Sequence, residues 1–187
     1  MKKIKLFLAS SNTLVDTRRR FELEIYRKCK LWFEQGVFLH LDVWEDLSAR
    51  MSEGRSQDEY NEKIEAADLF VLLASDKVGM YSAEEFDTAF GAFKAKQKPF
   101  VFTYFLQDAV PSGSSLELFK KKLSDLGHFY ASYKNDDDLW NQFNKELERL
   151  QIEQFKNNEW KAAGNDKKAD QEINFTGNEF NNNTFNF

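Results

Sequence analysis

One segment near the middle of the chain restricts the fold more than any other. After Asp68, residues Leu69 to Ala74 form a continuous apolar run of strand length. Such a run is typical of a strand buried on both faces of a parallel sheet, because a strand with one solvated face alternates apolar and polar residues. Parallel strands need crossover connections, which helices usually supply. We therefore expect a doubly wound α/β domain, with helices on both faces of the sheet.

The rest of the chain alternates strand-like apolar runs with segments of helical periodicity. Strands are expected at residues 4–9, 37–43, 68–74, 100–105 and 128–133, and helices at about 16–34, from 56, from 82, at 115–126 and at 136–150. The helices expected from Ser56 and Ser82 each carry glutamate three residues later, the pattern of a capping box. Five strands joined by helices predict right-handed crossovers, and the commonest solution at this size is the flavodoxin-like five-stranded parallel sheet of order 2-1-3-4-5.

Composition excludes several classes of protein. No apolar run approaches the roughly 20 residues of a membrane-spanning helix, and the first residues lead into a strand rather than a signal peptide, so we expect a cytoplasmic protein without membrane contact. The net charge of -5 argues against direct nucleic-acid binding, and the basic triplets 18–20 and 120–122 are expected on solvated helix faces. The single Cys29 cannot form an internal disulfide, and no histidine-rich or cysteine-rich spacing indicates a metal site.

The end of the chain has a different composition. We divide the sequence into an α/β domain at 1–160, a polar linker at 161–172 and an Asn/Phe-rich tail at 173–187. Phe175, Phe180 and Phe185 recur every five residues, which resembles the pentapeptide-repeat pattern. Three units do not complete one coil of a square β-helix, so the tail is a truncated solenoid, a strand that docks on a partner, a stacked cross-β assembly segment, or disordered.

Polar side chains follow the first and third expected strands. In the order 2-1-3-4-5 these two strands flank the point where the strand order reverses, and ligands bind there, outside the carboxyl ends of the strands. Ser10 and Ser11 follow the first strand, and Glu84 and Glu85 are expected at the start of the helix after the third. All four should face one crevice. Glu85 also closes the capping box that begins at Ser82, so helix capping is the alternative role for its carboxylate.

Several local sequences together resemble a bacterial TIR domain of the NAD-cleaving type. The resemblance rests on the order of elements and on three segments. These are Ala9-Ser10-Ser11 at the end of the first strand, the long loop after the second strand, and Glu85-Phe86-Asp87-Thr88-Ala89 at the head of the helix after the third strand. The resemblance covers roughly residues 3 to 155, and residues 44–47 and 55–61 are similar to a bacterial TIR-like subgroup. It implies that Glu85, with Glu84 as the neighbouring alternative, cleaves the bond between nicotinamide and ribose in NAD+. Ala83-Glu84 stands where animal and plant relatives often have Trp-Cys.

The implied chemistry suits a single carboxylate. Nicotinamide in NAD+ is already a cationic leaving group, so the site has only to stabilise the oxocarbenium-like ribose. Glu85 could hold the ribose hydroxyls, stabilise the developing charge or attack the anomeric carbon. Ser10 and Ser11 would offer hydroxyls and backbone donors, and NAD+ is the substrate, with no separate cofactor.

Three further residues are candidate contacts to the substrate. Trp44, at the mouth of the second strand, and Tyr104, at the end of the fourth, are candidate aromatic faces for a ring. Asp46 is a third candidate, although charged loop residues are most often only solvated.

The resemblance also implies partners and leaves two alternatives open. It implies a self-associating effector of bacterial anti-phage defence, in which residues 44–55 help to complete a neighbour's site and the tail is a second candidate contact. One alternative is a nucleoside deoxyribosyltransferase-like enzyme, which likewise places a glutamate after a strand of a flavodoxin-like sheet and breaks an N-glycosidic bond. The other is a TIR-type adaptor that assembles without catalysis.

Overall fold

The structure, a computed structural model, describes residues 1–43 and 56–150. Its strands are β1 (Lys2–Ser10), β2 (Val37–Asp42), β3 (Leu69–Ala74), β4 (Phe100–Leu106) and β5 (Ala131–Tyr133). Its helices are the 3-10 turn η1 (Asn12–Leu14), α1 (Val15–Phe33), α2 (Ser56–Glu65), α3 (Met80–Lys96), α4 (Ser115–Asp125) and α5 (Asp136–Leu150). The expected linker and tail lie outside the described residues.

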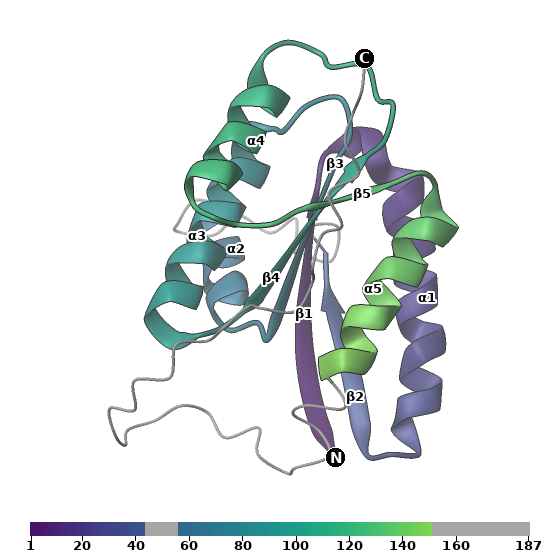
Figure 1. Ribbon diagram of the computed structural model, residues 1–187. Coiled ribbons are helices and arrows are strands. Elements are labelled where there is room, and N and C mark those ends of the chain that lie inside the picture. Colours follow the sequence, from purple (N-terminus) through teal and green to yellow (C-terminus); the bar gives the residue numbers. More distant parts are fainter. Residues whose placement is uncertain (44–55, 151–187) are drawn as a thin grey trace.

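The strands form one parallel sheet of order β2-β1-β3-β4-β5, which confirms the expected flavodoxin-like topology. Helices α1 and α5 cover one face, and α2, α3 and α4 cover the other (Figure 1). All six residues of β3 are buried between β1 and β4. Because side chains alternate along a strand, Leu69, Val71 and Leu73 enter the core under α1 and α5, while the residues between them enter the other core.

Phe143 of α5 is the centre of the core beneath α1 and α5. It is fully buried, and its ring lies 5.0 Å from that of Phe21, 5.7 Å from that of Phe102 and 6.4 Å from that of Trp140. Phe21 belongs to α1 and Phe102 to β4, so one side chain joins both helices to the sheet. Aromatic contacts of this kind add to the free energy of burial itself.

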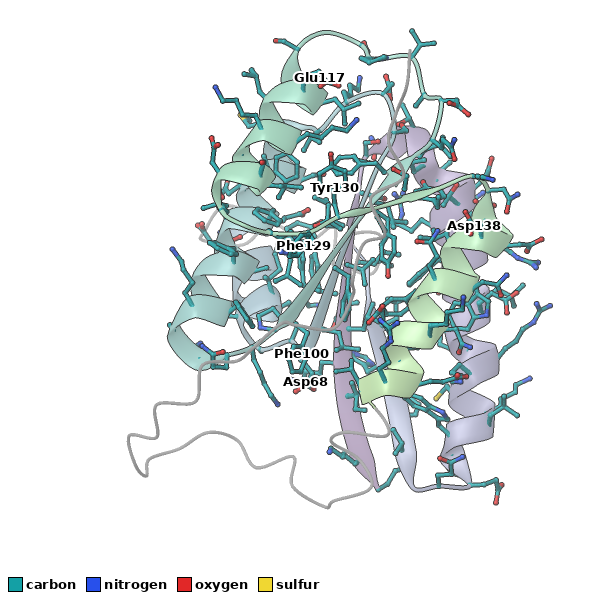
Figure 2. All side chains as sticks on the ribbon, in the orientation of Figure 1. Asp68, Phe100, Glu117, Phe129, Tyr130 and Asp138 are labelled. Atoms are coloured by element: carbon teal, nitrogen blue, oxygen red, sulfur yellow. The ribbon has the colours of Figure 1, made fainter. Side chains whose placement is uncertain are left out.

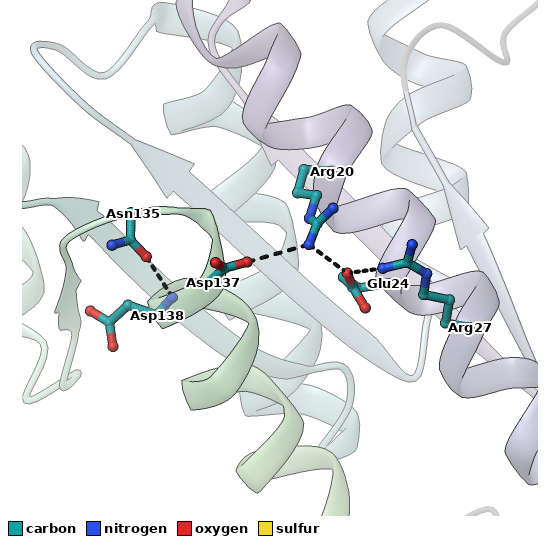
Figure 3. A network of polar contacts seen from close by, with 6 residues as sticks. All are labelled: Arg20, Glu24, Arg27, Asn135, Asp137 and Asp138. Atoms are coloured by element: carbon teal, nitrogen blue, oxygen red, sulfur yellow. Dashed lines mark hydrogen bonds and ion pairs between the residues drawn. The ribbon is translucent and has the colours of Figure 1, made fainter.

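Charged residues connect the outer edges of the same two helices (Figure 3). Arg20 of α1 lies 3.1 Å from Glu24 on its own helix and 3.4 Å from Asp137 on α5. The first turn of α5 is capped by Asn135, whose Oδ1 accepts the N–H of Asp138 at 2.9 Å. Arg20 is half-exposed and Asp137 is exposed, so this ion pair contributes little to stability compared with the aromatic core below it.

Helix α3 starts earlier than the sequence predicts. Gly79 is its N-cap residue, in an extended conformation with φ -69° and ψ 158°, and the N–H of Ala83 donates to Gly79 O at 3.0 Å. Ser82 therefore lies within the first turn and Glu85 in the second, and the first turn contains no acidic residue. The predicted capping box at Ser82 and Glu85 is wrong. Val78, which is buried, precedes this N-cap residue.

The first basic triplet is only partly solvated. Arg19 is exposed and Arg20 is half-exposed, but Arg18 is 2% exposed, so the expectation of a solvated helix face is wrong for this residue. Arg18 lies on the stripe of α1 that also carries Phe21 and Ile25, both of them core residues. Helical periodicity therefore turns its side chain inward. Of the second triplet, Lys121 is exposed and its neighbours are partly exposed.

The fifth strand is shorter than expected, because residues 128–130 do not join the sheet. Phe129 projects from the connection between α4 and β5 and is 80% exposed (Figure 2). Tyr130 packs its ring edge-on against Phe105, with 4.9 Å between ring centroids. Only Ala131 to Tyr133 pair with β4.

The hydroxyl of Tyr133 gives a first prediction. The side chain is fully buried, and its hydroxyl has no hydrogen-bond partner in the described part of the chain. Burial, followed by the charge of Asp136, raises the pKa of this hydroxyl. Because Tyr133→Phe removes an unsatisfied buried polar group, we expect it to raise the free energy of unfolding by about 1 kcal/mol. The midpoint temperature of thermal unfolding should rise by about 2–4 °C. Tyr130→Phe, at an exposed ring, is the matched control, and a loss of stability in Tyr133→Phe would contradict the prediction.

Candidate functional site

A pocket of about 810 Å³ lies at the carboxyl ends of β1 and β3. This is the edge of the sheet where the order of strands reverses, and the volume is within the range of sites for small organic ligands. Three parts of the chain supply its walls: the end of β1 with η1, the first two turns of α3 with the residues just before them, and one residue of α2. The lining includes Ser10, Ser11, Asn12, Thr13, Tyr60, Lys77, Met80, Tyr81, Ser82, Glu84 and Glu85.

Four of the residues singled out in the sequence meet at this pocket. Ser10 and Ser11 lie on one side, and Glu84 and Glu85 lie on the other. Glu85 is only 7% exposed, so its carboxylate belongs to the protected part of the wall, whereas Glu84 is more exposed. The earlier start of α3 adds residues before Ser82 and leaves Glu84 and Glu85 in the helix. Both residues still line the pocket.

Glu84 is held by a contact with a neighbouring helix. The amide of Asn61 on α2 donates to Glu84 Oε1 at 3.4 Å. The hydroxyl of Thr88 shares its one proton between Asn61 Oδ1, at 3.2 Å, and the backbone oxygen of Glu84, at 3.1 Å. This small network joins α2 to α3. Glu84 therefore has a structural role at the packed boundary between two helices.

A chain of hydroxyl groups connects the loops after β1 and β3. The side-chain oxygens of Ser11 and Thr13 are 2.6 Å apart, and those of Thr13 and Ser75 are 3.4 Å apart. Ser75, which is buried, donates to Asp76 Oδ1 at 2.9 Å. Thr13 and Ser75 were not candidates from the sequence. The available signal was their place in the polar segments that follow the first and third strands.

The buried Arg18 supports the same loop from behind. Its Nη1 donates to Ser10 Oγ and, at 3.3 Å, to the backbone oxygen of Ser11. Arg18 was not a candidate from the sequence either, because a basic triplet on a helix is usually solvated. Its inward position on the apolar stripe of α1 could have indicated it.

Tyr104 does not belong to the pocket wall. It is 3% exposed and lies in the core under α5, with its ring 6.5 Å from that of Phe143. Its partner in the sheet register is Leu73, which enters the same core. Because alternate residues of a strand face opposite sides, the expected role of Tyr104 as an aromatic face for substrate does not agree with its position. Burial, followed by the charge of Glu146, raises the pKa of its hydroxyl.

Other aromatic residues lie where a planar ligand could reach them. Tyr60 and Tyr81 both line the pocket, and Tyr81 is 60% exposed at its rim. Neither was a candidate from the sequence. Trp44 and Asp46, which were candidates, lie outside the described residues.

Residues 1–43 and 56–150 contain neither a metal-binding cluster nor a membrane-spanning helix. No group of histidine, cysteine, aspartate and glutamate side chains there could hold a metal ion. No helix in those ranges has the length and apolar character to cross a membrane.

Comparison with known proteins identifies the fold. No protein-family model matches the sequence, and no curated protein matches it. A structural neighbour is the crystal structure of the RPS4 and RRS1 TIR domain heterodimer, with a TM-score of 0.55 and 10% sequence identity. The match covers 81% of this chain and 99% of the neighbour's chain. The chain therefore has a TIR-like, flavodoxin-like α/β fold.

Proposed function

We propose that the protein is an NAD+ glycohydrolase in which Glu85 is the catalytic carboxylate. The observation that carries the proposal is a carboxylate, 7% exposed, in the wall of a ligand-sized pocket at the switch point of the sheet. A carboxylate held away from bulk water interacts more strongly with a positive charge that develops beside it. The TIR-like fold and the resemblance of residues 85–89 to NAD-cleaving TIR domains agree with this assignment.

The reaction breaks the bond between C1′ of ribose and the ring nitrogen of nicotinamide. The bonding electron pair goes to the ring nitrogen, which neutralises the cationic ring, so nicotinamide leaves without protonation. Positive charge develops on C1′ and the ring oxygen of ribose, and the Glu85 carboxylate stabilises it. Water then adds to C1′ and releases one proton, which gives ADP-ribose.

Glu85 suits this task better than its neighbour. Glu84 is tied to α2 through Asn61, so moving it toward a substrate would break the contact between two helices. Glu85 projects from the next position of α3, and its side chain is the more buried of the two. The hydroxyls of Ser10, Ser11 and Thr13 supply hydrogen bonds to the sugar or amide groups across the pocket.

We also propose that the protein associates with itself and acts as an effector of anti-phage defence. The structural neighbour is a heterodimer of TIR domains, and this paired arrangement of the fold is the precedent. In a parallel sheet, the carboxyl ends of β1 and β2 lie at the same edge. The end of β2, after which residues 44–55 follow in the sequence, therefore lies at the edge that carries the pocket. We propose that residues 44–55 help to complete a neighbour's site. The tail is the second candidate contact.

The test is an incubation of the full chain with NAD+ at low and high protein concentration, with nicotinamide measured by chromatography. We expect the rate of cleavage per molecule to rise steeply with concentration, because assembly completes the site. Parallel incubations contain deoxynucleosides. Release of free base from these with NAD+ intact would overturn the proposal in favour of a deoxyribosyltransferase-like enzyme. No turnover of either substrate by assembled protein would favour an adaptor.

A further inference from the structure

A charged side chain is buried directly behind the pocket wall. Arg18 is 2% exposed, and its Nη1 donates to Ser10 Oγ and to Ser11 O. Ser11 O also accepts the N–H of Leu14 at 3.0 Å, which closes the turn after β1. Removing a guanidinium from water costs free energy unless hydrogen bonds replace those to water. These contacts therefore fix both the arginine and the loop that it supports.

The contact with Arg18 determines the direction of the Ser10 hydroxyl proton. A guanidinium has only donors, so Ser10 Oγ is the acceptor and its own proton points elsewhere. Within the described ranges, no other hydrogen bond of Ser10 Oγ is present. Ser10 lines the pocket, so an atom inside the pocket can accept this proton. The positive charge behind the hydroxyl also polarises it and makes it a stronger donor.

We propose that Arg18 is a positioning residue, which acts through Ser10 to present an oriented O–H donor to an acceptor oxygen of the bound nucleotide. The inference rests on the proposed function and adds a contact to it. Arg18 itself is not among the residues that line the pocket, so its role is indirect. A hydrogen bond to the bound nucleotide that persists through the reaction strengthens ground state and transition state alike, so its loss raises KM and leaves kcat nearly unchanged.

The experiment is a double-mutant cycle on NAD+ cleavage by the full chain, under the conditions that give turnover. We expect Ser10→Ala and Arg18→Met each to raise KM about tenfold, the value for one lost hydrogen bond, with kcat within about twofold of the unmodified protein. The double variant should be no worse than either single variant, because both remove the same contact. Arg18→Lys, which keeps a charged donor, should restore most of the loss. Arg19→Met is the matched control, since Arg19 is 74% exposed on the same helix.

Each remaining result has a definite meaning. Losses that multiply in the double variant, or an Arg18→Met variant with normal KM and reduced kcat, would overturn the inference. The second pattern is what a merely structural role gives, because misfolded protein lowers the active fraction without changing the affinity of the rest. If the unmodified protein does not cleave NAD+ at all, the proposed function fails and this inference fails with it. Normal turnover that depends on Glu85, with KM unchanged in Arg18→Met, would overturn only the role of Arg18.

Discussion

Glu85→Gln should reduce the kcat for NAD+ cleavage by at least about 100-fold and leave the fold intact. The substitution preserves the size of the side chain and removes its negative charge. Deleting one preorganised electrostatic contact to the transition state typically costs a factor of 10² to 10³ in kcat, and the wall position of Glu85 keeps water from replacing that contact. Nicotinamide release at matched protein concentration measures the effect, and thermal unfolding verifies that the variant is folded.

Glu84→Gln is the matched control for this experiment. It lies next to Glu85 in the same pocket wall and carries the same charge, but it is bound to Asn61 of α2. We expect turnover within a few-fold of the unmodified protein, because an amide can still accept the hydrogen bond from Asn61. If the large loss occurs in Glu84→Gln and Glu85→Gln retains turnover, the reactive carboxylate is Glu84. If both variants retain full turnover, neither acid acts in catalysis.

The largest effect on stability should come from Phe143→Ala. The side chain is fully buried among the rings of Phe21, Phe102, Tyr104 and Trp140, so its removal leaves a cavity between α1, α5 and the sheet. Such substitutions cost about 3–5 kcal/mol. This is a large part of the roughly 5–15 kcal/mol that stabilises an ordinary domain. Urea denaturation should show a much lower midpoint.

Phe129→Ala provides the control for that measurement. Phe129 is 80% exposed, so the same change of residue type should alter the free energy of unfolding by no more than about 0.5 kcal/mol. A cost below about 1.5 kcal/mol in Phe143→Ala would mean that α5 does not close the core in solution as it does in the structure. Equal losses of unfolding free energy in the two variants would contradict the burial of Phe143 or the exposure of Phe129.

The fold could be predicted because its determinants are local. A run such as Leu69 to Ala74 has no polar residue to place in water, so it must be covered on both faces wherever it lies in the chain. Once the central strand is known, the rules for connections leave few topologies. The same rules place Ser10 and Glu85 at one edge, although 75 positions separate them in the sequence.

The details that could not be predicted depend on tertiary contacts. The capping pattern at Ser82 describes only a local hydrogen bond, whereas α3 begins one turn earlier, after the N-cap residue Gly79 and the buried Val78. Arg18 looks solvated until the loop residue Ser10 is placed beside it. Tyr104 lies near the end of its strand, where a side chain can reach a ligand. Its pairing with Leu73, however, places it on the face of the sheet that packs against the core.

The direction of β1 has a practical consequence for work on this molecule. The nine residues of β1 run from Lys2 to Ser10 and span about 30 Å, at about 3.3 Å per residue. The N-terminus therefore lies at the far end of the strand from the pocket (Figure 1). A purification tag or a surface tether fused ahead of Met1 would start at the end of β1 that is remote from the pocket, so immobilised or dye-labelled protein should keep the pocket mouth accessible.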